Sequence, residues 1–351
     1  MEESQLLVSR HGGHGHIRLN RPRALNSLTL DMVRLFTQAL KAFARDPDIV
    51  SVLVTGEGDR GLCAGGDIRA LYDLRDGDKN HYRVFWREEY ELNALIASFA
   101  KPYVVLMDGL VMGGGVGISA HGNCRVVTER TRLAMPETGI GFIPDVGGTW
   151  LLSRAGGPGI YMALSGATIS GADAIAAGLA DFSVRSEELR LLIERLQGVG
   201  HARDVKGAVN EFHCELETGE LARHKATLDQ AMMGATVEEI LSRLSATGSS
   251  FTNLAASEIK KRSPTSLKVT LALLREAAKS TSLETCLVRE FRAACRLLES
   301  HDLYEGIRAA IVDKDRMPGW RPPTLSEVTE AAVAEILAGD GSPEPSFAKG
   351  A

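Results

Sequence analysis

The sequence predicts an α/β fold followed by a long helical region. Residues 49–55 and 103–107 are largely apolar runs, and each is followed by a glycine-rich turn and the start of a helix. From residue 187 to 300 the pattern is almost wholly helical. We therefore expect an α/β core over residues 1–181, a helical extension over 182–338 and a disordered tail over 339–351.

Length and composition exclude several classes of protein. The 351 residues carry a formal net charge of −5, which leaves no global basic surface for nucleic acid. No run of 18 apolar residues is present, so we expect no membrane span. The five cysteines are scattered without a Cys-x-x-Cys pair, and the acidic N-terminus lacks signal and transit features. We therefore expect a cytoplasmic protein with reduced thiols.

The N-terminal segment predicts one or two strands, a loop and a helix. Residues 6–20 alternate between apolar and polar and turn through a histidine-rich segment. These histidines do not favour a metal site, because no carboxylate or cysteine accompanies them. The next loop carries Arg21 and Arg23 and is a candidate anion site. Helically spaced apolar residues from Met32 onward then predict a scaffold helix.

The first glycine turn follows the strand at 49–55. Its first glycines match a dinucleotide-binding pattern, but the two acidic residues between them would repel phosphates. The next residues, Cys-Ala-Gly-Gly-Asp, form a small-residue turn that opens a helix near Asp67. Its unpaired N–H groups suit an anion or oxyanion, and Asp67 as a simple helix cap is an equal alternative. Cys63 has no nearby histidine in the sequence that would activate it as a nucleophile.

A longer helix follows, with Glu89 on its apolar face. Phe85, Leu92 and Ile96 define that face at helical spacing. A carboxylate buried there costs on the order of several kcal/mol if it stays ionised and unpaired. We therefore expect either a structural ion pair or a ligand contact at Glu89, and the residues alone favour neither.

A second glycine turn follows the strand at 103–107. Residues 112–117 read Met-Gly-Gly-Gly-Val-Gly and lead into another helix start. Tandem glycines let main-chain N–H groups lie against a ligand, and a helix N-terminus favours a developing negative charge. Close packing of this helix against a neighbour is the alternative interpretation.

Two carboxylates then stand in a connection that is too rich in glycine for a helix. Residues 135–148 contain Glu137 and Asp145, and most of the residues between them are apolar. We expect partly dry carboxyl groups, which are candidate acids, bases or nucleophiles. Beyond this stretch, a capping box at 170–173 predicts helices up to about residue 182, and a last short helix is expected at 326–337.

The order of these segments resembles the crotonase (enoyl-CoA hydratase/isomerase) superfamily over about residues 6–181. The resemblance rests on two glycine turns, each between a strand and a helix, and on a Pro-Glu pair about twenty residues later. It implies a crotonase-like spiral of ββα units, with an oxyanion hole for an acyl-CoA carbonyl made by the peptide N–H groups of Gly66 and Gly114. It also implies that two loops hold the CoA nucleotide, through Arg23, Ala24, Asn26, Ala64, Gly65, Asp67 and Ile68.

A narrower resemblance extends almost end to end. The segments similar to the 3-hydroxyisobutyryl-CoA hydrolase branch are 87–90, 112–117, 135–148 and 305–315. The functional positions that carry over are Glu89, Gly114, Glu137 and Asp145. Glu89 would reach the hydroxyl of the acyl group, and Glu137 with Asp145 would attack the thioester or activate water. The sequence leaves open whether Glu137 is the nucleophile or the general base.

Gly117 separates this branch from the hydratases. A hydratase of the superfamily uses a second glutamate at this position, three residues after the oxyanion glycine. The resemblance therefore implies hydrolysis of a short-chain 3-hydroxyacyl-CoA, foremost 3-hydroxyisobutyryl-CoA in valine degradation, with CoA as part of the substrate and no separate cofactor or metal. An enoyl-CoA hydratase or isomerase is the alternative, and the intact acids argue against a non-catalytic binding protein. The resemblance also implies a possible homo-oligomer, because members commonly form trimers through C-terminal helices. The oligomeric state stays open, because the long extension after Asp181 could cover that interface.

Overall fold

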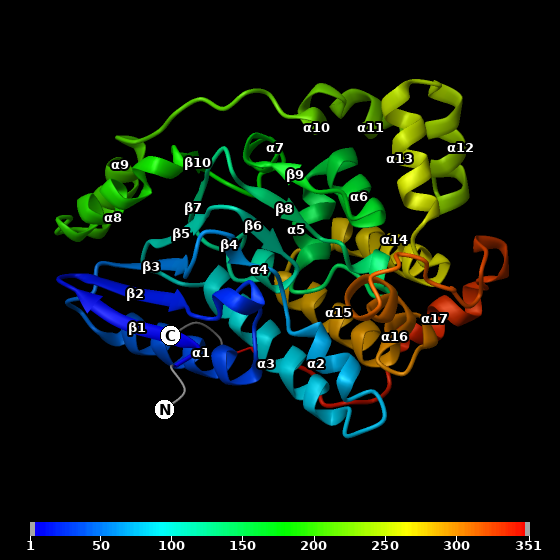
Figure 1. The fold of residues 1–351 in the computed structure, drawn as a ribbon, viewed down its shortest axis with the longest axis horizontal. Helices are drawn as coiled ribbons and strands as arrows, with labels where there is room; N and C mark the ends of the chain where they lie inside the picture. The colour runs from blue at the N-terminus through cyan, green and yellow to red at the C-terminus, as the bar shows by residue number, and fades with distance from the viewer. Residues whose placement is uncertain (1–3, 348–351) are drawn as a thin grey trace.

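A six-stranded sheet forms one layer of the N-terminal part of the molecule (Figure 1). A computed structural model describes residues 4–347. The strand order in this sheet is β1 (Leu6–His11), β2 (His14–Leu19), β3 (Ser51–Gly56), β5 (Tyr103–Met107), β7 (Cys124–Val127) and β10 (Phe182–Ser183). β1 and β2 pair antiparallel, and all other neighbours are parallel. The predicted N-terminal strands and both predicted buried strands are confirmed.

A second sheet has four short strands. Their order is β4 (Gly61–Cys63), β6 (Leu110–Met112), β8 (Arg132–Ala134) and β9 (Ile169–Ser170). β4, β6 and β8 are parallel neighbours, whereas β9 runs antiparallel to β8. Each of the three parallel strands comes directly after a strand of the larger sheet and before a helical segment. The chain thus repeats a strand–strand–helix unit, and the expected α/β spiral of ββα units is confirmed.

Two long helices pack against each other beside the sheets. They are α1 (Leu30–Arg45) and α3 (Asn80–Ala97). α1 begins where the hydroxyl of Thr29 accepts the N–H of Met32, and its buried residues have the predicted helical spacing. The helices that open at the two glycine turns are much shorter, namely α2 (Ile68–Asp73) and α4 (Gly114–Gly117).

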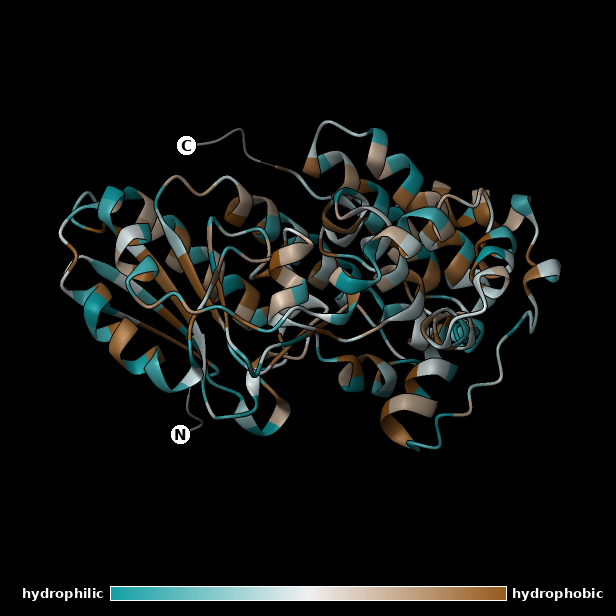
Figure 2. Cartoon of the chain, turned by 90° about the horizontal axis from the view of Figure 1, so that it is seen from above, coloured by the Kyte–Doolittle hydropathy of each residue, from teal (hydrophilic) through white to brown (hydrophobic). Residues whose placement is uncertain are grey.

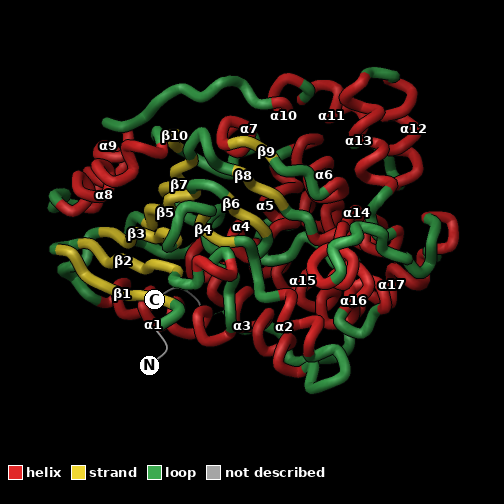
Figure 3. Tube along the Cα trace, viewed as in Figure 1, coloured by secondary structure: helices red, strands yellow, loops and turns green. Residues whose placement is uncertain are grey.

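The rest of the chain is mainly helical, as its apolar spacing predicts (Figure 3). The helices are α5 (Gly148–Arg154), α6 (Gly156–Ser165), α7 (Gly171–Ala176), α8 (Leu189–Gln197), α9 (Val205–Asn210), α10 (Glu220–Arg223), α11 (Lys225–Ala231), α12 (Val237–Thr247), α13 (Ser250–Lys260), α14 (Pro264–Lys279), α15 (Leu283–Leu297), α16 (His301–Ile307) and α17 (Glu330–Ala338). α14 and α15 both contact α5, which follows the segment that carries the two acids. Within residues 4–347, none of these helices is long and apolar enough to cross a membrane.

The larger sheet extends past the expected boundary at residue 181. α7 ends at Ala176, and β10 then pairs with β7 where the spacing predicts a continuing helix. α8 and α9 also belong with the sheet, because Leu192 and Val205 pack in one apolar cluster with Val104 of β5. An extended connection over 214–219 then leads across the molecule to α10 (Figure 1).

Residues 339–347 follow α17 without forming a helix or strand, yet they lie against the body of the molecule. Asp340 pairs with Arg83 of α3, and Glu344 pairs with an arginine of α15. The expectation of a disordered tail does not describe this segment, because opposite charges on two helices hold it in place. Residues 348–351 of the expected tail lie outside the described residues.

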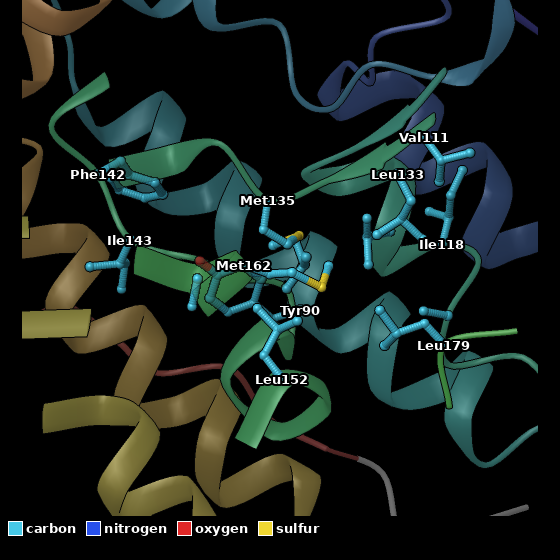
Figure 4. Packing of buried hydrophobic residues seen from close by; sticks show 14 of the residues in the cluster. Tyr90, Val111, Ile118, Leu133, Met135, Phe142, Ile143, Leu152, Met162 and Leu179 are labelled. Carbon is cyan, nitrogen blue, oxygen red and sulfur yellow. The ribbon is translucent and has the colours of Figure 1, made fainter. Parts of the chain in front are cut away.

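One apolar cluster joins the α/β part to the extension. In Figure 2, the strands inside the molecule are largely brown, whereas the surrounding helices alternate between brown and teal. Figure 4 shows part of this cluster, in which Tyr90 of α3 and Met135 and Phe142 of the acidic segment belong together with Leu152 of α5 and Met162 of α6. Because apolar burial is the main favourable term in folding, the acidic segment is anchored along its length.

Candidate active site

Three turns meet at one edge of the smaller sheet. β4, β6 and β8 are parallel neighbours, so their carboxyl ends lie together. The first glycine turn follows β4, the second follows β6, and Glu137 follows β8. Parallel pairing therefore brings together three segments that lie far apart in the sequence.

The two glycine turns are in direct contact. A methyl group built on Gly65 would lie 3.6 Å from the nitrogen of Gly114, and one built on Gly114 would lie 3.4 Å from the nitrogen of Gly66. Gly65 has a φ of +105° and Gly113 a φ of +49°, which residues with a side chain rarely adopt. Within residues 4–347, neither the N–H of Gly66 nor that of Gly114 donates a hydrogen bond. Two unpaired N–H donors thus lie side by side, as an oxyanion hole requires.

The two loops predicted to hold CoA run alongside each other. The N–H of Ala64 donates to Leu25, and the N–H of Leu28 donates to Gly65. Arg23 and Ala24 lie in a 3₁₀ turn, with Arg23 exposed to solvent, and Ile68 begins α2. The structure thus brings the predicted CoA loops together at the first glycine turn.

Two side chains predicted to bind CoA are already engaged within the protein. Asp67 accepts the N–H of Ala70 as the cap of α2, as one sequence interpretation expects, and pairs with Arg21 at 2.9 Å, while the N–H of Gly66 beside it has no acceptor among the described residues. The amide of Asn26 accepts the N–H of Arg21 and donates to the carbonyls of Glu57 and Gly61. These side chains therefore shape the loops, and the local sequence does not reveal the role of Asn26 or the pairing of Asp67 with Arg21.

Glu89 faces the second glycine turn from α3. Its side chain is 2% exposed, and its Oε1 has no hydrogen-bond partner among the described residues. A methyl group on Gly114 would lie 2.5 Å from this oxygen. Burial, and then the charges of Asp145 and Glu137, raise the pKa of Glu89 well above its usual value. Of the two sequence interpretations, a ligand contact fits this geometry, because no cation within residues 4–347 pairs with the carboxyl group.

Glu137 begins the 3₁₀ helix η2 (Glu137–Ile140), which is separated from β8 by Met135 and Pro136. Its Oε2 is buried and has no partner among the described residues, and a methyl group on Gly113 would lie 2.9 Å from its Oε1. Burial, and then the charge of Asp145, raise the pKa of Glu137 well above its usual value. The carboxyl group thus lies dry against the glycine turn, as the composition of the segment predicts.

Asp145 is held in place by Tyr90, the residue that follows Glu89 on α3. The hydroxyl of Tyr90 donates a 2.7 Å hydrogen bond to Oδ2 of Asp145. Burial raises the pKa of Asp145 to about 7, although this hydrogen bond opposes the increase. The next residue, Val146, has a φ of +52°, which costs on the order of 1–3 kcal/mol for a β-branched residue. Strain of this kind is typical of functional sites.

Glu290 of α15 is a further buried acid that the sequence analysis does not identify. It accepts the N–H groups of Gly147 and Thr149 at 2.7 and 2.9 Å and the hydroxyl of Thr149. Burial raises the pKa of Glu290 to about 8, against the effect of these hydrogen bonds. The available sequence signal is the same as at Glu89, because Leu287 and Ala294 place Glu290 on an apolar helix face.

Gly117 has no room for a side chain. A methyl group at this position would lie 2.7 Å from Cβ of Val146 and 2.8 Å from Nδ2 of Asn93. The space that a second glutamate would need is therefore occupied by α3 and by the strained turn after Asp145. Asn93 is a second residue of the site that the sequence analysis does not identify.

The site combines N–H donors with mutually repelling acids. Glu89, Glu137 and Asp145 lie close enough for their charges to affect one another. Cys63 is not suited as the nucleophile, because burial raises its pKa to about 12. Within the described part of the chain, no group of three or more histidine, cysteine or acidic residues is placed to hold a metal ion. Oxyanion donors beside a carboxyl group are the arrangement needed for acyl transfer.

Comparisons with curated proteins extend over the whole chain. The chain is 41% identical over 354 residues to the mitochondrial 3-hydroxyisobutyryl-CoA hydrolase of Mus musculus, with 99% of this chain and 92% of that protein covered. It is 39% identical to the Homo sapiens protein of the same name, with 98% and 91% covered.

The similarity to solved structures also extends over nearly the whole chain. A carnitinyl-CoA dehydratase from Mycobacterium thermoresistibile has a TM-score of 0.94 and 47% identity, covering 99% of this chain and 100% of that chain. An enoyl-CoA hydratase from Rhodobacter sphaeroides 2.4.1 has a TM-score of 0.89 and 39% identity, covering 96% and 98%. The family model described as enoyl-CoA hydratase/isomerase matches residues 14–337, and so includes both the α/β part and the helical extension. The chain therefore belongs to the enoyl-CoA hydratase/isomerase family.

Proposed function

We propose that this protein hydrolyses short-chain 3-hydroxyacyl-CoA thioesters, foremost 3-hydroxyisobutyryl-CoA, to the free acid and CoA. The observation that carries the proposal is the position of the buried Glu137 carboxyl group. One of its oxygens has no hydrogen-bond partner among the described residues, and the other lies against Gly113, next to the unpaired N–H of Gly114. The mouse and human relatives, which are named 3-hydroxyisobutyryl-CoA hydrolases, support this choice of substrate.

In the proposed reaction, the thioester oxygen accepts the N–H groups of Gly66 and Gly114. Attack on the carbonyl carbon moves negative charge onto this oxygen, where each donor contributes about 3 kcal/mol to lowering the barrier. Collapse of the tetrahedral intermediate breaks the C–S bond, and CoA leaves as a thiolate that takes up a proton. Glu89 binds the acyl end of the substrate in this arrangement.

Two routes are compatible with the geometry. In the first, Glu137 attacks and forms a mixed anhydride that water then cleaves; in the second, Glu137 or the pair of Glu137 and Asp145 removes a proton from the attacking water. Single-turnover hydrolysis in heavy-oxygen water tests for the first route. Label in the Glu137 carboxyl group by mass spectrometry shows that a mixed anhydride formed and that water attacked its Glu137 carbonyl carbon, whereas the general-base route places label in the product alone.

We expect Glu137→Gln to abolish thiol release while acyl-CoA binding survives. The amide neither attacks the thioester nor removes a proton, but it fills nearly the same volume beside Gly113. Thiol release with 3-hydroxyisobutyryl-CoA and titration calorimetry with a non-hydrolysable analogue measure the two properties. The exposed Glu276→Gln is the matched control, since Glu276 pairs with Lys279 on α14. Normal turnover by Glu137→Gln would reject the proposal.

Hydration or dehydration of an acyl-CoA is the second candidate. The solved relatives named as a carnitinyl-CoA dehydratase and an enoyl-CoA hydratase favour it, and Asp145 could supply the second carboxyl group that Gly117 lacks. Thiol release from 3-hydroxyisobutyryl-CoA and loss of crotonyl-CoA absorbance, measured on one preparation, distinguish the two. Absorbance loss without thiol release would favour the second candidate.

We further propose that the CoA nucleotide lies along the two paired loops. Arg23 would face its phosphates, and Ala24, Ala64, Gly65 and Ile68 would contact the rest, with Asn26 and Asp67 holding the loops in shape. Arg23→Gln should therefore raise KM with little change in kcat. We propose no cofactor beyond the CoA of the substrate, so dialysis against a chelator should leave thiol release unchanged.

We also propose a reducing compartment, with the cytoplasm as the first expectation. Five free cysteines among the described residues are consistent with it. The mouse and human relatives are named as mitochondrial proteins, so cell fractionation of the tagged protein would decide the compartment. Assembly into a homo-oligomer is a separate proposal, which light scattering after gel filtration tests.

A further inference from the structure

Asn93 is fully buried on α3, and neither of its polar side-chain atoms is satisfied. Its relative exposure is 0%, and both Oδ1 and Nδ2 lack a hydrogen-bond partner among the described residues. Buried amides are nearly always hydrogen-bonded, since an unpaired polar group destabilises a folded protein. A group of this kind inside an active site is therefore a candidate for ligand binding.

Asn93 and Glu89 form a matched pair one helical turn apart. Residues at this spacing have Cβ atoms about 5–6 Å apart on one helix face, and both side chains here are buried and unpartnered. The two side chains face the same short helix, since Glu89 lies against Gly114 and Asn93 lies against Gly117. The first residue of that helix is the second oxyanion donor.

The two side chains are complementary to a hydroxyl group. A hydroxyl both donates and accepts, and the Asn93 amide offers one donor group and one acceptor. Glu89 accepts when it is ionised and both donates and accepts when it is protonated. A bridging hydroxyl therefore satisfies both residues in either protonation state of Glu89.

We infer that Asn93 and Glu89 together bind a hydroxyl group at the acyl end of the site, with Asn93 as a substrate-positioning residue. The inference rests on the proposed thioester hydrolysis and deepens it. The hydroxyl has two sources, the 3-hydroxyl of the acyl group or the attacking water. Either source explains why the buried Asn93 amide lies against Gly117, next to the second glycine turn.

The variant Asn93→Leu tests the inference, because leucine has the same number and branching of side-chain heavy atoms and no polar atoms. An amide retained for a ligand should be replaceable without loss of stability, so we expect an equal or higher Tm. Asn123→Leu is the control for an amide that is hydrogen-bonded within the protein. The Asn123 amide accepts the N–H of Tyr103 and donates to Phe99 and Lys101, so its replacement should lower Tm.

Turnover with two substrates identifies the source of the hydroxyl. If the pair binds the 3-hydroxyl, Asn93→Leu should lower kcat/KM about tenfold or more for 3-hydroxyisobutyryl-CoA and little for isobutyryl-CoA. If it binds the attacking water, kcat should fall about equally for both. Binding of thioether analogues with and without the hydroxyl gives a readout that does not depend on turnover.

These measurements separate the inference from the proposed function. A wild-type enzyme that releases thiol from neither substrate rejects the proposed function, while weaker binding of the hydroxylated thioether by Asn93→Leu still supports the pair. The inference is overturned if Asn93→Leu changes neither thiol release nor analogue binding. It is also overturned if Tm falls as in Asn123→Leu while kcat per folded enzyme stays the same.

Discussion

Gly114 and Gly117 stand one turn apart on α4, and each is closed to a side chain by a different residue of α3. At Gly114 the obstacle is the carboxyl oxygen of Glu89, and at Gly117 it is the amide of Asn93 together with Val146. Gly117 therefore does more than leave out the glutamate that a hydratase has at this position. Because Gly117 has no side chain, the amide of Asn93 from α3 can lie against it.

A single substitution should therefore not restore a hydratase site. We expect Gly117→Glu to lower Tm by several degrees, because its Cβ would overlap Cβ of Val146, and to produce no hydration of crotonyl-CoA. Scanning fluorimetry and absorbance at the enoyl band measure the two properties. Gly207→Glu is the control, since nothing lies within 4 Å of a methyl group there. Efficient hydration by Gly117→Glu would contradict this account of the site.

The acids also predict how the rate depends on pH. Burial raises the pKa of Asp145 to about 7 and raises the pKa of Glu137 well above its usual value, so Asp145 loses its proton only as the pH rises through about 7. Since attack or base catalysis needs an ionised carboxylate, kcat should rise with pH through about 7. Asp145→Asn should displace this rise, and a rate that stays flat from pH 5 to 9 would contradict the prediction.

At the scale of elements, α15 reaches the site through two successive residues. Glu290 binds the backbone after Asp145, and Phe291 packs edge-on against Tyr90 at 6.3 Å between ring centroids. Tyr90 in turn donates to Asp145. Helix α15 thus fixes Asp145 in two ways. Glu290 binds the backbone of the turn that follows Asp145, and Phe291 packs against Tyr90, which donates a hydrogen bond to Asp145.

We expect Glu290→Gln to lower kcat about tenfold or more with little change in analogue binding. The amide nitrogen of glutamine cannot accept the N–H of Gly147 or Thr149, so the turn after Asp145 loses a bond that sets its position. Steady-state kinetics and calorimetry separate this effect from a loss of folded protein. Glu276→Gln serves again as the exposed control, and an unchanged kcat in Glu290→Gln would show that α15 only stabilises the fold.

At the scale of the whole molecule, burying these acids couples stability to pH. In the unfolded chain Asp145 and Glu290 have pKa values near 3.8 and 4.5, whereas in the folded chain the values are about 7 and 8. Between these limits the folded chain binds more protons than the unfolded chain. The free energy of unfolding therefore falls as the pH rises.

We expect Tm to decrease from about pH 6.5 to pH 8. Below this range the unfolded chain also protonates His16 and His121, whose pKa burial lowers to about 4 in the folded protein, and this opposes the effect of the acids. Glu290→Gln removes one of the responsible groups, so its Tm should fall less over the same range. Calorimetric scans at constant ionic strength provide the measurement. A wild-type Tm that rises between pH 6.5 and 8 would show that the acids are ionised in the folded protein.

Much of this site could be predicted from the sequence, because its parts are local patterns. The glycine turns, the acids after Met135 and the buried position of Glu89 all follow from composition and spacing. The hydrogen bonds of Asn26, the pairing of Asp67 with Arg21, and the contact of Glu290 with the turn after Asp145 could not be predicted. They depend on contacts between segments far apart in the chain, and the same holds for β10 and for the charged tail segment.

The crowding of acids at the site has a consequence for product release. Hydrolysis of a thioester creates a new carboxylate, and it does so beside Glu89, Glu137 and Asp145, with no cation among the residues 4–347 acting on these three. The substrate thioester is uncharged at this point, whereas the acid product meets repulsion as soon as it ionises. The same carboxyl groups that prepare the attack would thus expel the acid and oppose its return.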